Sequence, residues 1–185
     1  TFNSQVGSSA SSTSTVGQTF YRALTVTEIA VVKGGAQTFS NPGGAYLRLQ
    51  IFEWDPSNDP NVTTTWATGS GGTNPVASAG MTSLLDQNFW CPPSTMLDES
   101  IIHFELDSAV TLSENTAYGF TIEFVFSGAG GTSMTFKQST GGDFAQGTKL
   151  STTATANNSG GGTHDLAFYL VGTPHPPIPS IFLFR

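Results

Sequence analysis

Apolar residues recur at every second position along most of this chain. Within residues 46–54 the apolar positions Leu47, Leu49 and Ile51 alternate with a second set, which comprises Tyr46, Arg48, Gln50, Phe52 and Trp54. The same period of two runs through residues 101–106, 118–125 and 166–171. Successive residues of a β-strand point to opposite faces of the sheet, so this period indicates strands. We therefore predict strands in these segments, and we find no pattern typical of an amphipathic helix.

Shorter or less regular segments indicate further strands, at residues 18–21, 24–32, 110–112 and 134–136. The period changes phase inside residues 24–32, and a β-bulge at Thr27 and Glu28 would explain the change. Two other stretches follow no period and are rich in small polar residues, namely residues 55–99 and 151–163. We expect long loops there. The first is expected to hold a short strand near residues 76–79 and an aromatic anchor at Phe89 and Trp90.

Eight or nine short strands joined by polar turns are typical of two packed sheets. The predicted fold class is therefore all-β, a single two-sheet antiparallel β-sandwich, and we expect its strand order to be that of a jelly roll. The predicted boundaries are a polar N-terminal tail at residues 1–16, the sandwich at residues 17–172, and a Pro-rich spacer with an apolar C-terminal strand at residues 173–185.

The charge content changes the list of plausible partners. Charged residues make up 10% of the chain, against roughly 25% in an average soluble domain, and six Lys and Arg against 13 Asp and Glu give a net charge of -7. No basic patch exists to neutralise phosphates, so nucleic acid is not an expected partner. No apolar run reaches the length of roughly 18 residues that a membrane span needs, so no span is expected.

Motifs that mark catalytic sites are missing from the sequence. There is no Gly-x-Ser-x-Gly elbow, no His-Glu-x-x-His and no Cys and His spacing suited to zinc. Cys91, the single cysteine, has no basic neighbour in sequence to activate it and is expected to be buried. The histidines, His103, His164 and His175, are expected on the surface. We therefore predict a protein that is not an enzyme.

Calcium is the one cofactor that the sequence suggests. Asp55 and Asp59 lie in a stretch with oxygen-bearing side chains at alternate positions, and Asp165 precedes the last predicted strand. Carboxylate, amide and carbonyl oxygens are the ligands of a structural Ca²⁺. The alternative is that the residues between 55 and 59 only form turns around Pro56 and Pro60.

One strand face suggests a polysaccharide as a partner. Tyr46, Phe52 and Trp54 offer rings that can stack on sugars, and Arg48 and Gln50 offer hydrogen bonds to hydroxyl groups. Trp66 and Trp90 would extend this platform. The alternative is that the same face is a second packing layer covered by residues 55–99, since aromatic residues on strands usually serve packing.

Residues 181–184 suggest that the partner is another copy of this chain. This run, Ile181, Phe182, Leu183 and Phe184, is an apolar strand preceded by a spacer with four prolines, Pro174, Pro176, Pro177 and Pro179. An extended apolar segment can add to the open edge of a neighbour's sheet, with Ile181 and Leu183 filling one set of pockets. A head-to-tail contact that does not close produces a filament. The alternative is that the segment completes its own sheet.

Several short motifs occur in an order that resembles a known class. They are residues 17–20 (GQTF), 47–55 (LRLQIFEWD), 112–124 (LSENTAYGFTIEF), 141–147 (GGDFAQG) and 165–172 (DLAFYLVG). This order resembles the β-sandwich of exported bacterial surface proteins of the PEP-CTERM sorting class, which is similar to non-catalytic carbohydrate-binding modules. In that class a Val-Pro-Glu-Pro motif, an apolar helix and an Arg cluster follow the domain, and residues 173–185 resemble a degenerate remnant of them. The resemblance implies export, a surface location and no catalysis.

Taken together, these patterns predict a secreted, non-catalytic protein of the cell surface or extracellular matrix that assembles with copies of itself through its terminal segments. The alternative prediction is a carbohydrate-binding module that recognises a polysaccharide through its aromatic strand face.

Overall fold

The computed structural model describes residues 9–11, 14–37, 45–55, 67–68, 73–74, 80–93, 95–125, 133–138, 149–153 and 165–174. These residues form strands joined by turns, as the alternating pattern predicted. The strands are β1 (Ser9–Ser11), β2 (Ser14–Phe20), β3 (Leu24–Gln37), β4 (Tyr46–Trp54), β5 (Ala67–Thr68), β6 (Thr73–Asn74), β7 (Met81–Trp90), β8 (Ile101–Leu112), β9 (Ala117–Val125), β10 (Ser133–Phe136), β11 (Lys149–Thr153) and β12 (Phe168–Pro174). A helix able to cross a membrane does not occur in the described ranges.

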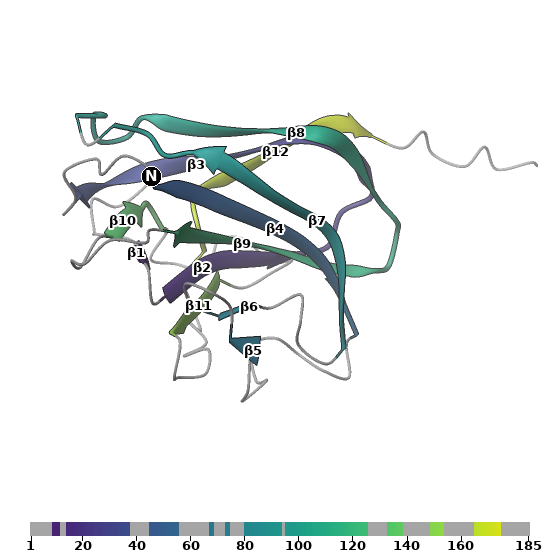
Figure 1. The fold of residues 1–185 in the computed structure, drawn as a ribbon. Helices are drawn as coiled ribbons and strands as arrows, with labels where there is room; N and C mark the ends of the chain where they lie inside the picture. The colour runs from purple at the N-terminus through teal and green to yellow at the C-terminus, as the bar shows by residue number, and fades with distance from the viewer. Residues whose placement is uncertain are drawn as a thin grey trace, which may run out of the picture.

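Two antiparallel four-strand sheets pack face to face as a sandwich (Figure 1). The first has the order β2–β9–β4–β7, and β11 pairs with the outer edge of β2. The second contains β8, β3, β12 and β10. The prediction of an all-β sandwich is therefore confirmed. The pair β5 and β6 forms a separate two-stranded sheet.

The third position of the second sheet is shared by two strands in line. Val32 donates its N–H to Ala167 O at 3.0 Å and accepts a hydrogen bond from Lys137 N–H at 2.8 Å. The N–H and the C=O of one strand residue point to the same edge of that strand, and those of Val32 bond to the segments next to β12 and β10 respectively. The strands β12 and β10 therefore follow one another along a single edge of β3. At the β10 end, β1 pairs with both β10 and β2 and so joins the two sheets.

The core lies between the sheets and is built from the predicted alternating positions. Leu47, Leu49 and Ile51 of β4 point inward together with Phe120 and Phe124 of β9, and all five are buried. Across the sandwich, Phe89 of β7 meets Phe104 of β8 edge to face, with ring centroids 5.0 Å apart. Aromatic pairs of this geometry add to the free energy gained from burial.

The predicted bulge in β3 is confirmed, and one strand was missed. The pairing of β3 with β8 shifts register between Val26 and Glu28. The strand β7 lies in the stretch that was expected to be a loop. Its alternation is interrupted at Leu84 and Leu85, where the register with β4 shifts between Ile51 and Phe52. A bulge at this point hides the period of two in the sequence. The short strand expected near residues 76–79 lies outside the described residues.

Candidate functional site

The two long sides of the sandwich differ in how their edge strands are connected. On one side, β7 of the first sheet lies beside β8 of the second, and one side chain bridges them. The Gln87 side chain accepts a hydrogen bond from the Asp107 N–H at 3.1 Å and donates one to Glu105 O at 3.3 Å. One amide side chain thus occupies a backbone donor and a backbone acceptor of β8, as a neighbouring strand would.

On the other side, β12 presents an edge that no described strand covers. Within the described ranges β12 pairs with β3 alone, from Phe168 opposite Val31 to Pro174 opposite Leu24. The two sheets are connected farther along this side, where Gln18 of β2 donates to Asp165 Oδ1 at 2.9 Å and accepts from Leu166 N–H at 3.0 Å. The side is therefore joined near residues 165–166 and open along β12.

The open edge has an apolar groove beside it. A cavity of about 320 Å³ is lined by Arg22, Leu24, Phe168, Tyr169 and Leu170. Leu24, Phe168 and Leu170 pack against the main core but are only partly buried. The Phe168 ring lies 5.4 Å from the Phe120 ring across the sandwich. The groove therefore exposes part of the core beside β12.

The opposite face of β12 is apolar and exposed. Tyr169 is 47% exposed and Val171 is 44% exposed, and residues 172–174 are exposed as well. The strand is held tightly on its inner side, because a Cβ placed at Gly172 would lie 2.1 Å from the Thr25 carbonyl oxygen. This glycine allows β12 to approach β3 at the bulge between Val171 and Gly172.

The residues predicted to contact a neighbouring copy, Ile181, Phe182, Leu183 and Phe184, lie outside the described residues. What the described residues provide is a surface of the kind such a segment needs: a long exposed strand edge with an apolar groove along it. Sequence reasoning did not identify this surface. Its signal was present, since residues 166–171 show a period of two, but a sequence does not say which strand lies at the edge of a sheet.

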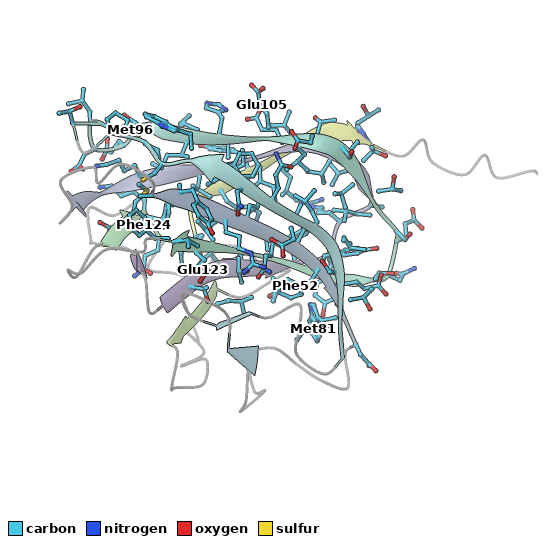
Figure 2. All side chains as sticks on the ribbon, in the orientation of Figure 1. Phe52, Met81, Met96, Glu105, Glu123 and Phe124 are labelled. Carbon is cyan, nitrogen blue, oxygen red and sulfur yellow. The ribbon has the colours of Figure 1, made fainter. Side chains whose placement is uncertain are left out.

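The predicted sugar-binding face of β4 is largely covered. Gln50 and Phe52 are fully buried, Trp54 is 6% exposed, and Arg48 is mostly buried. Phe52 and Trp54 pack with Leu150 of β11, Ala117 and Met81 in a second apolar cluster on this face, and Figure 2 shows Phe52 and Met81 near each other. Burial removes these rings from a sugar platform, which favours the packing alternative for them. Trp66 lies outside the described residues.

A polar cluster occupies the middle of the same face. Arg48 donates to both Asp86 oxygens, at 2.7 Å from Nε and 2.5 Å from Nη2, and its Nη1 lies 3.5 Å from Glu123 Oε2. Gln50 donates to Asp86 at 3.2 Å. The hydrogen bonds from Arg48 hold the pKa of Asp86 below its ordinary value, and the same contact raises the pKa of Arg48. Arg48 of β4 thus contacts Asp86 of β7 and Glu123 of β9, and it connects these three strands.

One end of the face remains open to solvent. Trp90 and Tyr46 are directly opposite each other in the β4–β7 pairing, and Trp90 is 72% exposed. The neighbouring Asn88 is exposed too. Among the predicted sugar-binding residues that the structure describes, Trp90 is well exposed and Tyr46, opposite it, is partly exposed.

The predicted metal ligands are dispersed. Asp165 is buried against Gln18, whereas Asp55 is exposed at the far end of β4 and donates its N–H to Gly80 O. Asp59 lies outside the described residues. No group of three or more His, Cys, Asp or Glu side chains that could hold an ion occurs in the part of the chain that the structure describes. Calcium remains a prediction from the sequence.

Cys91 and His103 lie where the sequence predicted, one buried and the other at the surface. Cys91 is buried, as predicted, and desolvation raises the pKa of its thiol to about 11. Such a thiol is a poor nucleophile near neutral pH. His103, predicted at the surface, is exposed and its Nδ1 lies 2.6 Å from Glu28 Oε1.

No protein-family model matches the chain, and no curated protein matches it either.

Proposed function

We propose that this protein is a non-catalytic, exported structural subunit that assembles by strand addition, and that the open edge of β12 is the acceptor. The donor is residues 181–184 of a second copy. The observation that carries the proposal is the asymmetry between the two sides of the sandwich. Gln87 bridges β7 and β8 on one side, whereas β12 leaves seven residues of strand and an apolar groove on the other. An uncovered edge of this kind is a template for another chain.

The strand order supports this reading. We propose that the sandwich is a jelly roll, a fold of about eight strands in two sheets, with one strand position left for a partner. In the second sheet β12 and β10 share one edge of β3, so along β12 that sheet is three strands wide and consists of β8, β3 and β12. The fourth position lies beside β12. A donor strand there would complete the second sheet.

The sequence of the donor fits the groove. Ile181 and Leu183 are apolar and two residues apart, so in an extended strand they project to the same face. Directed into the groove, they would contact Leu24, Phe168 and Leu170. Phe182 and Phe184 would then lie beside Tyr169 and Val171 on the outer face. The prolines after β12 favour an extended spacer over a tight turn, which favours donation to a neighbour.

The test is the mass of the purified protein in solution, by light scattering, with negative-stain microscopy of the same sample. We expect filaments or large particles that disperse when residues 181–185 are deleted. Val171→Lys places a charge on the acceptor edge and should also disperse them. Ser108→Lys, on an exposed part of β8, is the matched control and should leave them intact. A monomer in the unmodified protein contradicts the proposal.

A second candidate function, recognition of a polysaccharide, is favoured by Trp90. This indole is exposed on a strand, opposite Tyr46, and such amphipathic rings make large contacts at little cost in conformational entropy. The resemblance to carbohydrate-binding modules supports the same candidate. Trp90→Ala should abolish binding to polysaccharides without changing assembly. Release of new reducing ends during incubation would contradict the proposal that the protein is non-catalytic.

A further inference from the structure

The outer face of the second sheet is hollowed where β8, β3 and β12 lie side by side (Figure 1). Val32 and Ile101 are opposite each other in the β3–β8 pairing, and both point away from the core, because their neighbours Val31 and Ile102 belong to it. Together with Tyr169 of β12 they form the apolar part of a cavity of about 350 Å³. This volume is within the range of roughly 300–1,000 Å³ that small-molecule sites occupy.

Two charged side chains complete the wall, and backbone hydrogen bonds to β3 hold both residues in place. Lys137 donates its N–H to Val32 O at 2.8 Å, and Glu99 donates its N–H to Lys33 O at 3.1 Å. Lys137 Nζ lies 3.4 Å from Glu99 Oε1. The cavity therefore presents a cation and an anion side by side, next to an apolar surface.

The Lys137 ammonium has donors to spare. Its side chain is 9% exposed, whereas that of Glu99 is 75% exposed. Because Lys137 lines the cavity beside this exposed carboxylate, we place its head group at the cavity and its apolar stem beneath the surface. An ammonium has three N–H donors, and within the described ranges the contact with Glu99 is the one ion pair of Lys137. A ligand anion would supply a further acceptor.

Glu99 faces this cavity from an unusual backbone conformation. Its φ is 66°, in the left-handed region that favours glycine. A residue with a Cβ is strained there, and strain of this kind clusters at ligand-binding sites. The ion pair with Lys137 does not account for it, since an exposed carboxylate gains little from such a pair. The strained position therefore indicates a further use for the carboxylate.

The paired charges restrict the chemistry of the ligand. Glu99 repels an anion and Lys137 repels a cation, so a ligand with a single charge is disfavoured. A neutral sugar would place hydroxyl groups without partners against Val32 and Ile101. An α-amino acid carries a carboxylate and an ammonium group on the same carbon atom, which matches the adjacent Lys137 and Glu99. An apolar side chain on that carbon matches the rest of the wall.

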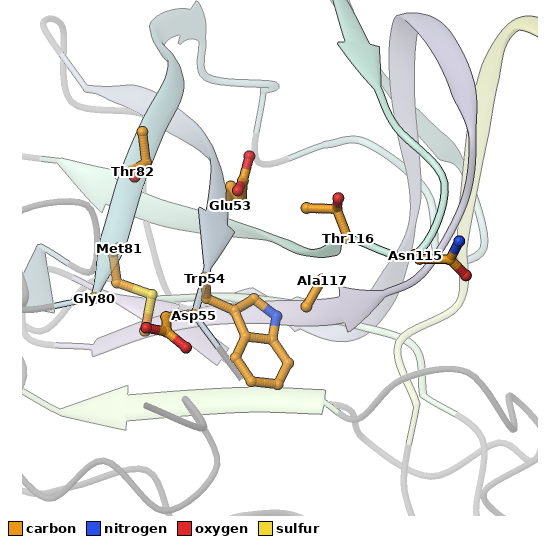
Figure 3. Close-up of a pocket in the computed structure, with 9 residues that line it drawn as sticks. All are labelled: Glu53, Trp54, Asp55, Gly80, Met81, Thr82, Asn115, Thr116 and Ala117. Atoms are coloured by element: carbon orange, nitrogen blue, oxygen red, sulfur yellow. The ribbon is translucent and has the colours of Figure 1, made fainter. Parts of the chain in front are cut away.

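A larger cavity, of about 580 Å³, lies where β4 ends and β9 begins, and its wall lacks such a convergence (Figure 3). Its Glu53 and Trp54 are successive residues of β4 and point in opposite directions. The indole nitrogen of Trp54 is buried, and the ring packs with Ala117, Leu150 and Met81. One ligand could not contact both side chains.

We propose that the cavity beside Lys137 binds a free α-amino acid with an apolar side chain. The ligand carboxylate accepts a hydrogen bond from Lys137 Nζ, and the ligand ammonium group donates to the Glu99 carboxylate. The ligand side chain lies on Val32, between Ile101 and Tyr169. Hydrogen bonds between charged groups are stronger than those between neutral groups. This site goes beyond the proposed assembly and does not depend on it.

The test is equilibrium dialysis of the full chain against L-phenylalanine and L-leucine, and separately against D-glucose. Dialysis reports binding whether or not the protein is assembled. We expect saturable binding of at least one of the two amino acids, with one site per chain, and no binding of glucose at the same concentrations. The N-acetyl derivative of that amino acid lacks the ammonium charge, and its amide lacks the carboxylate. Each derivative should bind about tenfold more weakly.

Substitutions assign each charge to its partner. Lys137→Met should weaken binding of the free amino acid by about tenfold or more, and it should not weaken binding of the amide. Glu99→Gln should weaken binding of the free amino acid similarly, and it should not weaken binding of the N-acetyl derivative. A merely structural role would weaken all these ligands alike. Glu114→Gln, exposed between β8 and β9, is the matched control and should leave binding unchanged.

If Lys137→Met does not fold, as judged by circular dichroism, Glu99→Gln and the two derivatives decide. Three results would overturn the proposal: neither amino acid binds; glucose binds in their place; or an amino acid binds equally well to the unmodified protein and to both variants. Tyr169 lines this cavity and the acceptor groove, so the two sites are neighbours. Val171→Lys should prevent assembly and leave amino-acid binding unchanged, so failure of this site and failure of the assembly proposal are distinguishable.

Discussion

The side chain of Gln87 accepts a hydrogen bond from the backbone N–H of Asp107 and so bridges the edge strands β7 and β8 of the two sheets. The same side chain donates to the carbonyl of Glu105, two residues earlier on β8. We find no described residue that does the same for β12. This difference between the two sides is the basis of the proposed mode of assembly.

Gln87→Ala should destabilise the protein by about 1 kcal/mol and lower its melting temperature by a few degrees, because two partly exposed hydrogen bonds are lost. It should also uncover a second pair of strand edges and increase disordered aggregation. Differential scanning calorimetry and turbidity measure the two effects. Asn88→Ala, at the next and exposed position, is the control. Equal stability of the two variants would show that the Gln87 contact does not close the edge.

Asp86→Asn should lower the free energy of unfolding by about 1 kcal/mol at neutral pH, since partial exposure weakens the ion pair with Arg48. The folded-state pKa of Asp86 lies below its ordinary value of 3.8. The stabilisation is therefore present above pH 3.8 and is lost as the pH falls through the lower folded-state value. Urea unfolding of both proteins between neutral and acidic pH measures this difference. A difference that persists unchanged in acid would contradict the assignment.

Gly172→Ala should detach β12 from β3, because the added Cβ would lie 2.1 Å from the Thr25 carbonyl oxygen. We expect a loss of roughly 2 kcal/mol or more and faster hydrogen exchange of the amides in residues 168–174. A second glycine substitution, Gly80→Ala, is not a suitable control. Gly80 has a φ of 78°, and a residue with a Cβ would strain the backbone there. Thr173→Ala, which keeps an exposed side chain on the same strand, is suitable. If exchange in β12 is unchanged, the close approach of the two strands is not required.

Cys91 should resist alkylation by iodoacetamide at neutral pH. Its thiol is buried and its pKa is raised to about 11, so little thiolate forms. The rate of modification, followed by mass spectrometry, should rise sharply when the protein is unfolded in urea. Rapid labelling of the native protein would show that Cys91 is accessible.

Much of the fold could be predicted from residue types alone. The alternation in residues 46–54 and 118–125 identified β4 and β9, and the change of phase identified the bulge in β3. Periodicity reports which face of a strand is apolar. It failed for β7, because the register shift with β4 places Leu84 and Leu85 in succession.

The candidate sites were harder to predict, because burial depends on the whole fold. Tyr46, Phe52 and Trp54 share one face of β4, yet Phe52 is buried whereas Trp90, opposite Tyr46, is exposed. Likewise, Asp55 and Asp165 looked alike in sequence, but one lines an open cavity and the other is buried against Gln18. The open edge of β12 follows from strand order, which a single sequence does not specify.

The most direct test of strand addition is disulfide trapping between two singly substituted proteins. One protein carries Val171→Cys on the acceptor edge, and the other carries Phe182→Cys or Phe184→Cys in the donor segment. If the donor of one copy pairs with β12 of another, oxidation of the mixture should yield a disulfide-linked dimer of the two species, since paired strands bring Cβ atoms within bonding range. The account is contradicted if the mixture yields no mixed dimer while a chain carrying both substitutions forms an internal disulfide as a monomer, because the segment would then complete its own sheet.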